Sequence, residues 1–214
     1  DNGIELGSVT SDGTGNWRFE PQTPMSEGNH AISATVITAA GGESQATPVF
    51  DFNIDSTPPG KPGNDGDTGI GSVIDDVGVV QGPIANGGTT DDTTPTFNGK
   101  GEPGDTIHIF DNDELLGSVE VQPDGDWSFT PPSLSEGEHE ITVIIEDPAG
   151  NQSEASDPWV VIVDTTPPDA PTIGSIYDDA GSKQGYLQPG DMTDDTTPTL
   201  KGQAEAGAKV EIYD

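Results

Sequence analysis

The chain repeats itself at an interval of just over one hundred residues, and this repetition constrains its fold more than any other feature. Residues 1–9 (DNGIELGSV) return as residues 111–119 (DNDELLGSV), at an offset of 110. Residues 90–96 (TDDTTPT) return as residues 193–199, at an offset of 103. This interval matches one β-sandwich module and exceeds the length of a solenoid repeat. We therefore expect tandem modules.

Two proline-rich segments mark the expected joints between modules. They are residues 55–59 (DSTPP) and 164–168 (DTTPP), and each follows a hydrophobic alternation. Consecutive prolines stiffen a joint because their φ angle is fixed and they donate no backbone hydrogen bond. We expect residues 1–57 to be the C-terminal part of a first module, 58–167 a complete module, and 168–214 the N-terminal part of a third.

Hydrophobic residues alternate with polar ones, which is typical of half-buried strands. Ile141, Val143 and Ile145 occupy alternate positions among Glu140, Thr142 and Glu146, and Trp127 and Phe129 flank a serine. Glycines and prolines (29 and 19) separate these runs and discourage helices. Strands are predicted near 95–101, 105–111, 114–121, 126–130, 138–147 and 157–164, with a weakly marked one within 70–84. Seven short antiparallel strands predict an all-β chain of tandem immunoglobulin-like β-sandwich modules.

The net charge of the chain limits the classes of partner that it can bind. Its 39 acidic and 6 basic residues give a formal net charge of −33. Such a chain has few cations to offer to nucleic acid or to an anionic membrane, so we expect neither nucleic-acid binding nor membrane insertion. No apolar run is long enough to span a bilayer. Divalent cations are the natural partners of this charge.

Many of the aspartates are expected to meet at one end of a module. If successive strands alternate in direction, the loops after the first and third strands share a pole with the end of the last strand. Ca²⁺ takes six to eight oxygen ligands, which clustered carboxylates and turn carbonyls supply. We predict calcium bound at the joints. The candidate ligands are Asp55, Asp75, Asp76, Asp91, Asp92, Asp111, Asp113, Asp164, Asp178, Asp179, Asp194 and Asp195.

The competing interpretation is that these aspartates only form turns and keep the chain soluble. It suffices for any single aspartate. The adjacent pairs 75–76 and 91–92 return as 178–179 and 194–195. Adjacent like charges are unfavourable without a purpose, so their recurrence favours a metal.

No catalytic arrangement is expected. His30 and His139 occupy equivalent positions, and a structural hydrogen-bonding role is predicted for both. No G-x-S-x-G nucleophile motif occurs, and carboxylates that repeat in every module suit structure better than glycoside hydrolysis. Trp159 is the one aromatic residue left as a candidate surface contact. We therefore predict that the chain is not an enzyme.

Four motifs resemble a known family: residues 164–173 (DTTPPDAPTI), 193–205 (TDDTTPTLKGQAE), 125–131 (GDWSFTP) and 147–151 (DPAGN). They are similar to the bacterial Ig-like repeats of giant surface adhesins (RTX/Bap-like) secreted by type I systems. The resemblance implies an extracellular extender on the bacterial cell surface, serving cell adhesion or biofilm formation, with calcium at its junctions. It also implies contacts with neighbouring modules of the same chain, and a host-cell or matrix receptor bound by other parts of the parent protein.

Two other functions stay open at this point. The chain could be a module that binds glycan or protein through its loops or through Trp159. It could also be a spacer in a secreted polysaccharide-active enzyme.

Overall fold

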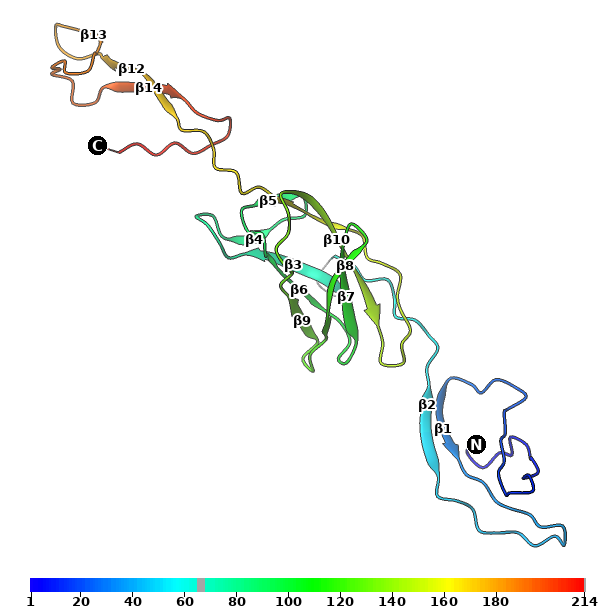
Figure 1. Ribbon diagram of the computed structural model, residues 1–214. Helices are drawn as coiled ribbons and strands as arrows, with labels where there is room; N and C mark the ends of the chain where they lie inside the picture. Colours follow the sequence, from blue (N-terminus) through cyan, green and yellow to red (C-terminus); the bar gives the residue numbers. More distant parts are fainter. Residues whose placement is uncertain (65–67, 214) are drawn as a thin grey trace. The chain divides into compact units, whose positions relative to one another are not determined.

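A computed structural model of the protein describes residues 1–64 and 68–213 (Figure 1). Every regular element in these residues is a β-strand. Their contacts divide the chain into two compact units, residues 1–164 and 165–214. Within the described part, no helix has the length and apolar character needed to cross a membrane. The fold class is all-β.

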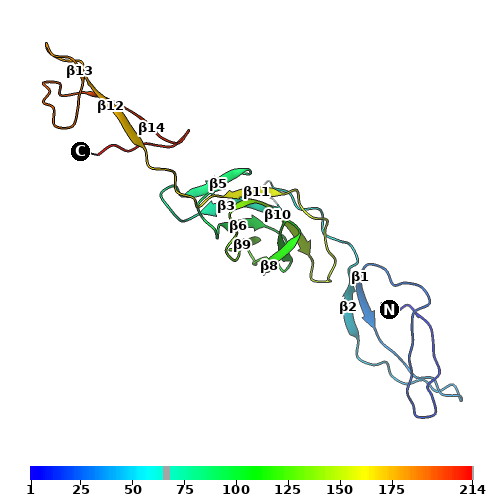
Figure 2. The same ribbon diagram turned by 45° about the horizontal axis from the view of Figure 1, so that its top comes forward.

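The central part of the first unit is a complete two-sheet sandwich (Figures 1 and 2). One sheet has the order β4 (Gly82–Ile84), β3 (Gly69–Asp75), β6 (Thr96–Lys100) and β9 (Asp126–Phe129). The other has the order β5 (Gly88–Thr90), β11 (Trp159–Val163), β10 (Gly137–Glu146), β7 (Thr106–Asp111) and β8 (Glu114–Glu120). Two facing sheets of short strands with these pairings form an immunoglobulin-like sandwich.

Side chains of alternating strand positions fill the space between the two sheets. On β10, Ile141 and Val143 are fully buried, and on β7 Ile107 and Ile109 are too. The facing sheet contributes Ile70, Val73, Phe97 and Trp127 to the same core. Alternate residues of a strand point to opposite faces, so the period-2 pattern alone places these residues inside.

The region 70–84, where one strand was expected, contains two short ones, β3 and β4, and a further short strand, β5, follows them. β5 pairs in parallel with β11, so the expectation of antiparallel pairing alone is wrong here. The chain crosses from one sheet to the other between β4 and β5. Asn86 Oδ1 accepts a hydrogen bond from the Val160 N–H (2.8 Å), and Gly87 N donates to the Val160 carbonyl (2.8 Å). Gly87 has a φ of 83°, which favours glycine at this crossing.

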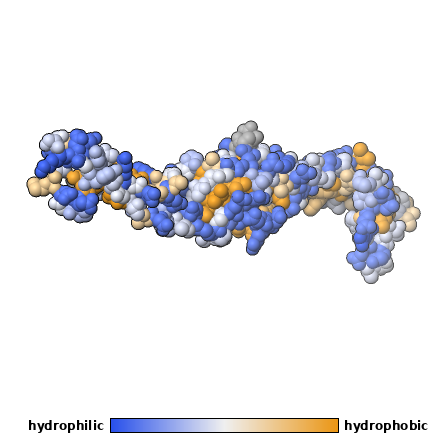
Figure 3. Space-filling view, turned by 90° about the horizontal axis from the view of Figure 1, so that it is seen from above, coloured by the Kyte–Doolittle hydropathy of each residue, from blue (hydrophilic) through white to orange (hydrophobic). Residues whose placement is uncertain are grey.

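The terminal parts contain fewer strands. Within residues 1–57, β1 (Gly28–Ile32) pairs antiparallel with β2 (Phe50–Ile54). In the second unit, β12 (Thr172–Asp178) lies between β13 (Gly185–Tyr186) and β14 (Thr199–Gln203). By the sequence repeat, β1 and β2 correspond to β10 and β11, and the second unit corresponds to β3, β4 and β6. Figure 3 shows a mainly hydrophilic surface interrupted by hydrophobic patches.

Candidate functional site

Five of the predicted aspartates lie at one end of the complete sandwich, which we call the acidic pole: Asp75, Asp76, Asp91, Asp92 and Asp164. Asp75 ends β3, the pair 91–92 follows β5, and Asp164 follows β11. The parallel register sets Val163 beside Thr90, and Asp164 N donates to the Thr90 carbonyl (2.9 Å). The same register therefore places Asp164 beside Asp91.

Asp92 is a buried acceptor that holds the loop between β5 and β6. Its side chain is only 1% exposed. Oδ1 accepts hydrogen bonds from the backbone N–H (2.7 Å) and the hydroxyl (3.1 Å) of Thr94. Oδ2 accepts one from the Asp76 N–H (3.3 Å), which joins this loop to the turn after β3.

Asp75 completes the same network from the end of β3. Its Oδ1 accepts from the Val77 N–H (3.0 Å), and its Oδ2 accepts from the Thr90 hydroxyl (2.5 Å). The Thr90 hydroxyl oxygen in turn accepts from the Asp92 N–H (3.0 Å). Asp75 and Asp92 are thus occupied by hydrogen bonds that bind three chain segments together.

Asp76 and Asp91 face the solvent instead. Among the described residues, none donates a hydrogen bond to either side chain. The Asp91 carboxylate lies against Gly78, where a Cβ atom would come within 2.0 Å of Asp91 Oδ2. A shallow hollow of about 440 Å³ opens here, and its lining includes Asp75, Asp91 and Asp164. Each aspartate pair therefore has one buried and one solvent-facing member.

The second unit reproduces this division residue for residue. Asp178 Oδ2 accepts from the Thr193 hydroxyl (2.7 Å), and Asp195 Oδ2 accepts from the Asp179 N–H (3.2 Å). The Thr197 N–H donates to Asp195 Oδ1 (2.8 Å) and lowers the pKa of this carboxyl, since it stabilises the charged form. Asp194 lies against Gly181 as Asp91 lies against Gly78.

This reproduction shows that the network is local. The second unit contains the counterparts of β3, β4 and β6, and no other named strand among its described residues. The network therefore forms without the facing sheet. It joins the Asp-Asp-Thr-Thr-Pro segment to the end of β12, fifteen to sixteen residues earlier in the chain.

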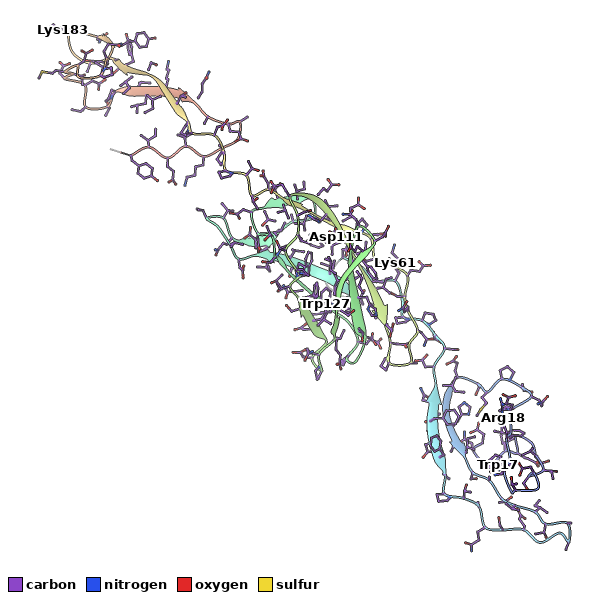
Figure 4. The ribbon with its side chains drawn as sticks, viewed as in Figure 1. Trp17, Arg18, Lys61, Asp111, Trp127 and Lys183 are labelled. Atoms are coloured by element: carbon purple, nitrogen blue, oxygen red, sulfur yellow. The ribbon has the colours of Figure 1, made fainter. Side chains whose placement is uncertain are left out.

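Asp111, which is labelled in Figure 4, lies apart from the acidic pole and forms a hydrogen bond with His139. Its Oδ2 is 2.7 Å from His139 Nδ1, and His139 Nε2 is 2.9 Å from the Ser135 carbonyl. Asp111 faces Ile141 on β10, whereas Val163 faces Gly137. Four residues of strand separate these levels, a distance of about 13 Å.

The histidine contact has the structural role that the sequence predicts. Burial disfavours the imidazolium, but the Ser135 carbonyl and the Asp111 carboxylate together raise the pKa of His139 above its ordinary value. The first copy repeats the arrangement: His30 Nδ1 is 2.5 Å from Asp1 Oδ2, and its Nε2 is 2.7 Å from the Ser26 carbonyl.

The two remaining candidates, Asp113 and Asp55, lie outside the strands. Asp113 is exposed between β7 and β8 with a φ of 70°, which aspartate tolerates better than most residues. Asp55 is also exposed, and its Oδ1 accepts from the Thr57 N–H (3.1 Å). The Asn151 side chain donates to the Asp55 carbonyl (3.1 Å), a contact that the sequence did not predict.

Sequence reasoning also missed a buried acid, Asp105. It is 5% exposed, and burial is the main cause of its raised pKa, followed by the nearby charges of Glu102 and Asp147. The sequence pattern could have predicted this burial, because Asp105 lies two residues before Ile107 and four before Ile109 and so shares their buried side of the strand. No group of three or more His, Asp or Glu side chains in the described residues is placed to hold a metal ion.

Trp159 is half-buried and packs against the core. Its indole nitrogen is buried, and no described residue accepts a hydrogen bond from it. This position does not favour Trp159 as a surface contact for a ligand.

A comparison with protein families agrees with the fold. A model of a bacterial Ig-like domain family matches residues 1–56 and 76–165. Among solved structures, a "Biofilm associated protein - BSP domain" is similar, at 20% identity and a TM-score of 0.31, over 69% of this chain and 21% of that chain. Fibronectin(III)-like modules of Clostridium thermocellum CbhA are similar at 16% identity and a TM-score of 0.33, over 65% of this chain and 64% of that chain.

The chain therefore spans about a fifth of the first of these structures and less than two thirds of the second. Among curated protein sequences, none matches it.

Proposed function

Because the chain belongs to the bacterial Ig-like domain family, we propose that it is a structural, non-catalytic segment of a bacterial cell-surface adhesin, stiffened by calcium at its joints. Its modules would extend the parent protein from the cell, in adhesion or biofilm formation. Neighbouring modules of the same chain are its direct partners in this proposal, and a receptor would be bound elsewhere in the parent.

The observation that carries the proposal is the division of each aspartate pair. Asp75 and Asp92 hold their loops, so calcium is not needed to explain them. Asp76 and Asp91 have no such role, yet the same solvent-facing acids return as Asp179 and Asp194. Each of these carboxylates repels its acidic neighbours and forms no stabilising hydrogen bond with a described residue. A bound cation that neutralises the charge would explain why an acid recurs at these positions.

Calcium fits this donor set in chemistry. Carboxylates, turn carbonyls and water are the ligands that Ca²⁺ prefers, in flexible geometry at 2.3–2.6 Å. Asp91 and Asp164 are neighbours by strand register, and Asp164 opens the stiff DTTPP joint. In the proposal a cation held by both draws the joint toward the β5–β6 loop and restricts its bending. Asp76 is the third candidate ligand.

A calcium titration followed by small-angle X-ray scattering tests the proposal. We expect the distribution of interatomic distances to become narrower in millimolar calcium than in chelator. The double variant Asp91→Asn, Asp194→Asn should lose this response. The matched control Glu120→Gln removes a charge from β8, away from the pole, and should keep the response. Identical scattering of the unmodified chain with and without calcium would exclude calcium stiffening.

A further inference from the structure

The strand by which the chain leaves the complete sandwich is hydrogen-bonded on both sides. β11 lies between β5 and β10 (Figure 2), parallel to the first and antiparallel to the second. β3 is the first strand of the sandwich and β11 is the last, and Asp164 follows directly after β11. Tension along the chain therefore enters the sandwich at β3 and pulls on β11 from its C-terminal end.

The parallel pairing of β5 with β11 sets their hydrogen bonds across the direction of this pull. Gly88 faces Val161 and Thr90 faces Val163 in the register. Tension that reaches β5 through β3 and β4 pulls β5 by its N-terminal end, whereas β11 is pulled by its C-terminal end. Because the strands are parallel, they are drawn past each other in opposite directions. All the bonds between them then carry the load together, whereas a hairpin pulled open at its ends loses its bonds one at a time.

An asparagine extends this pairing beyond the three residues of β5. Asn86 Oδ1 accepts a hydrogen bond from the Val160 N–H (2.8 Å), and Asn86 Nδ2 donates one to the Pro158 carbonyl (3.3 Å). The Gly87 N–H donates to the Val160 carbonyl (2.8 Å). These bonds connect the residues just before β5 with the start of β11. The chain from residue 158 to residue 164 is thus bonded to residues 86–90 along its length.

A buried threonine ties the pair to the first strand at the acidic pole. The Asp164 N–H donates to the Thr90 carbonyl (2.9 Å). The Thr90 hydroxyl, on a residue that is 4% exposed, donates to Asp75 Oδ2 (2.5 Å) at the end of β3. The strand at which tension enters and the strand at which it leaves are therefore both joined to β5.

We propose that β5 and β11 form a mechanical clamp, the strand pair whose separation limits unfolding of the module under tension. Forced unfolding is governed by the unfolding barrier and not by equilibrium stability, so bonds that break together at that barrier decide the rate. The role of the clamp in the parent protein rests on the proposed extender function. The clamp itself rests on strand topology and requires no calcium.

Pulling the full chain by its two ends in a single-molecule force instrument, in chelator, tests the clamp. The complete module should unfold in one event that releases roughly 350 Å of chain. Asn86→Ala removes two hydrogen bonds between the paired segments, and we expect its unfolding rate at constant force to rise about tenfold.

Ser153→Ala is the matched control. Ser153 Oγ likewise forms two bonds with the backbone, accepting from the Ile145 N–H (3.0 Å) and donating to the Glu154 carbonyl (2.8 Å). These bonds lie in the connection between β10 and β11, outside the clamp. We expect both variants to lower the unfolding midpoint in urea, but only Asn86→Ala to unfold faster under force. Equal unfolding rates of the two variants under force would overturn the proposal.

A cross-link across the clamp gives the sharper result. The chain has no cysteine, and Thr89 faces Ile162 in the parallel register. Neighbouring strands lie about 4.8 Å apart, within the reach of a disulfide, so Thr89→Cys with Ile162→Cys can lock the pair. The unfolding event should vanish in the oxidised form, at forces that unfold the reduced form, and return on reduction.

The contrary outcome is equally distinct. If the oxidised form unfolds at the same force, with the released length shortened by roughly 250 Å because the residues between 89 and 162 stay enclosed, the limiting contact lies elsewhere and the clamp is excluded. Because the measurement is made in chelator, that outcome leaves the calcium response of the joints untouched.

Discussion

Replacing Asp92 with Ala should strongly destabilise the complete module. The change removes the acceptor of three hydrogen bonds at a side chain that is 1% exposed. Two backbone N–H groups, those of Asp76 and Thr94, lose their partner. Each polar group left unsatisfied inside the protein costs about 1–3 kcal/mol, so for these two groups we expect the free energy of unfolding to fall by about 2–6 kcal/mol. This is a large part of the roughly 5–15 kcal/mol that stabilises a typical domain.

Asp91→Ala is the matched control, because it removes the same side chain one residue away. In chelator we expect a change within about 0.5 kcal/mol, the usual range for a surface substitution away from special features. In calcium we expect Asp91→Ala to lower the stability of the module. A ligand at one hundred times its dissociation constant adds about 2.7 kcal/mol to the stability of the native state. Asp91→Ala should lose this gain.

Urea denaturation followed by tryptophan fluorescence measures both effects. The background variant Trp17→Phe removes the signal of the exposed tryptophan, so that Trp127 and Trp159 report on the complete module. Unfolding midpoints are compared in chelator and in millimolar calcium. Equal destabilisation by Asp91→Ala and Asp92→Ala in chelator would refute the division into buried and solvent-facing acids.

Three further predictions follow from the core and the buried titratable groups. Trp127→Ala should lower the free energy of unfolding by about 3–5 kcal/mol in urea denaturation. Trp17→Ala should lower it by less than about 0.5 kcal/mol, because Trp17 is exposed; equal effects would contradict their different burial. Because the pKa of His139 is raised in the folded state, its protonation stabilises the fold. This contribution is fully present below the ordinary pKa of 6.5 and is lost as pH rises through the folded-state pKa. Asp111→Asn should make the unfolding midpoint fall less steeply with rising pH. An unchanged slope would contradict the stabilising contact between Asp111 and His139. Asp105→Asn should raise the melting temperature at neutral pH, because burial opposes the charge of this carboxyl, and a lowered melting temperature would refute that account.

The sequence predicted the sandwich well where strands alternate and less well where tertiary contacts decide. On β10 every second residue from Ile141 to Ile145 is apolar, so burial follows from a period of two. The region of β3 to β5 contains many glycines and a proline, which weaken a strand signal. The parallel pairing of β5 depends on β11, about seventy residues further along the chain. No local pattern contains that information.

The acidic pole shows the same limit at the level of single residues. Sequence spacing found the aspartate pairs but could not assign a role to each member. Alternation along β3 explains Asp75, because it shares the buried face of Val73. The burial of Asp92 depends on hydrogen bonds to a turn that lies sixteen residues earlier in the chain, so its role emerges only from the fold. Because the hydrogen-bonded and the solvent-facing acids are adjacent yet separate, a substitution at Asp91 changes the charge at the joint without removing the network that holds the loop.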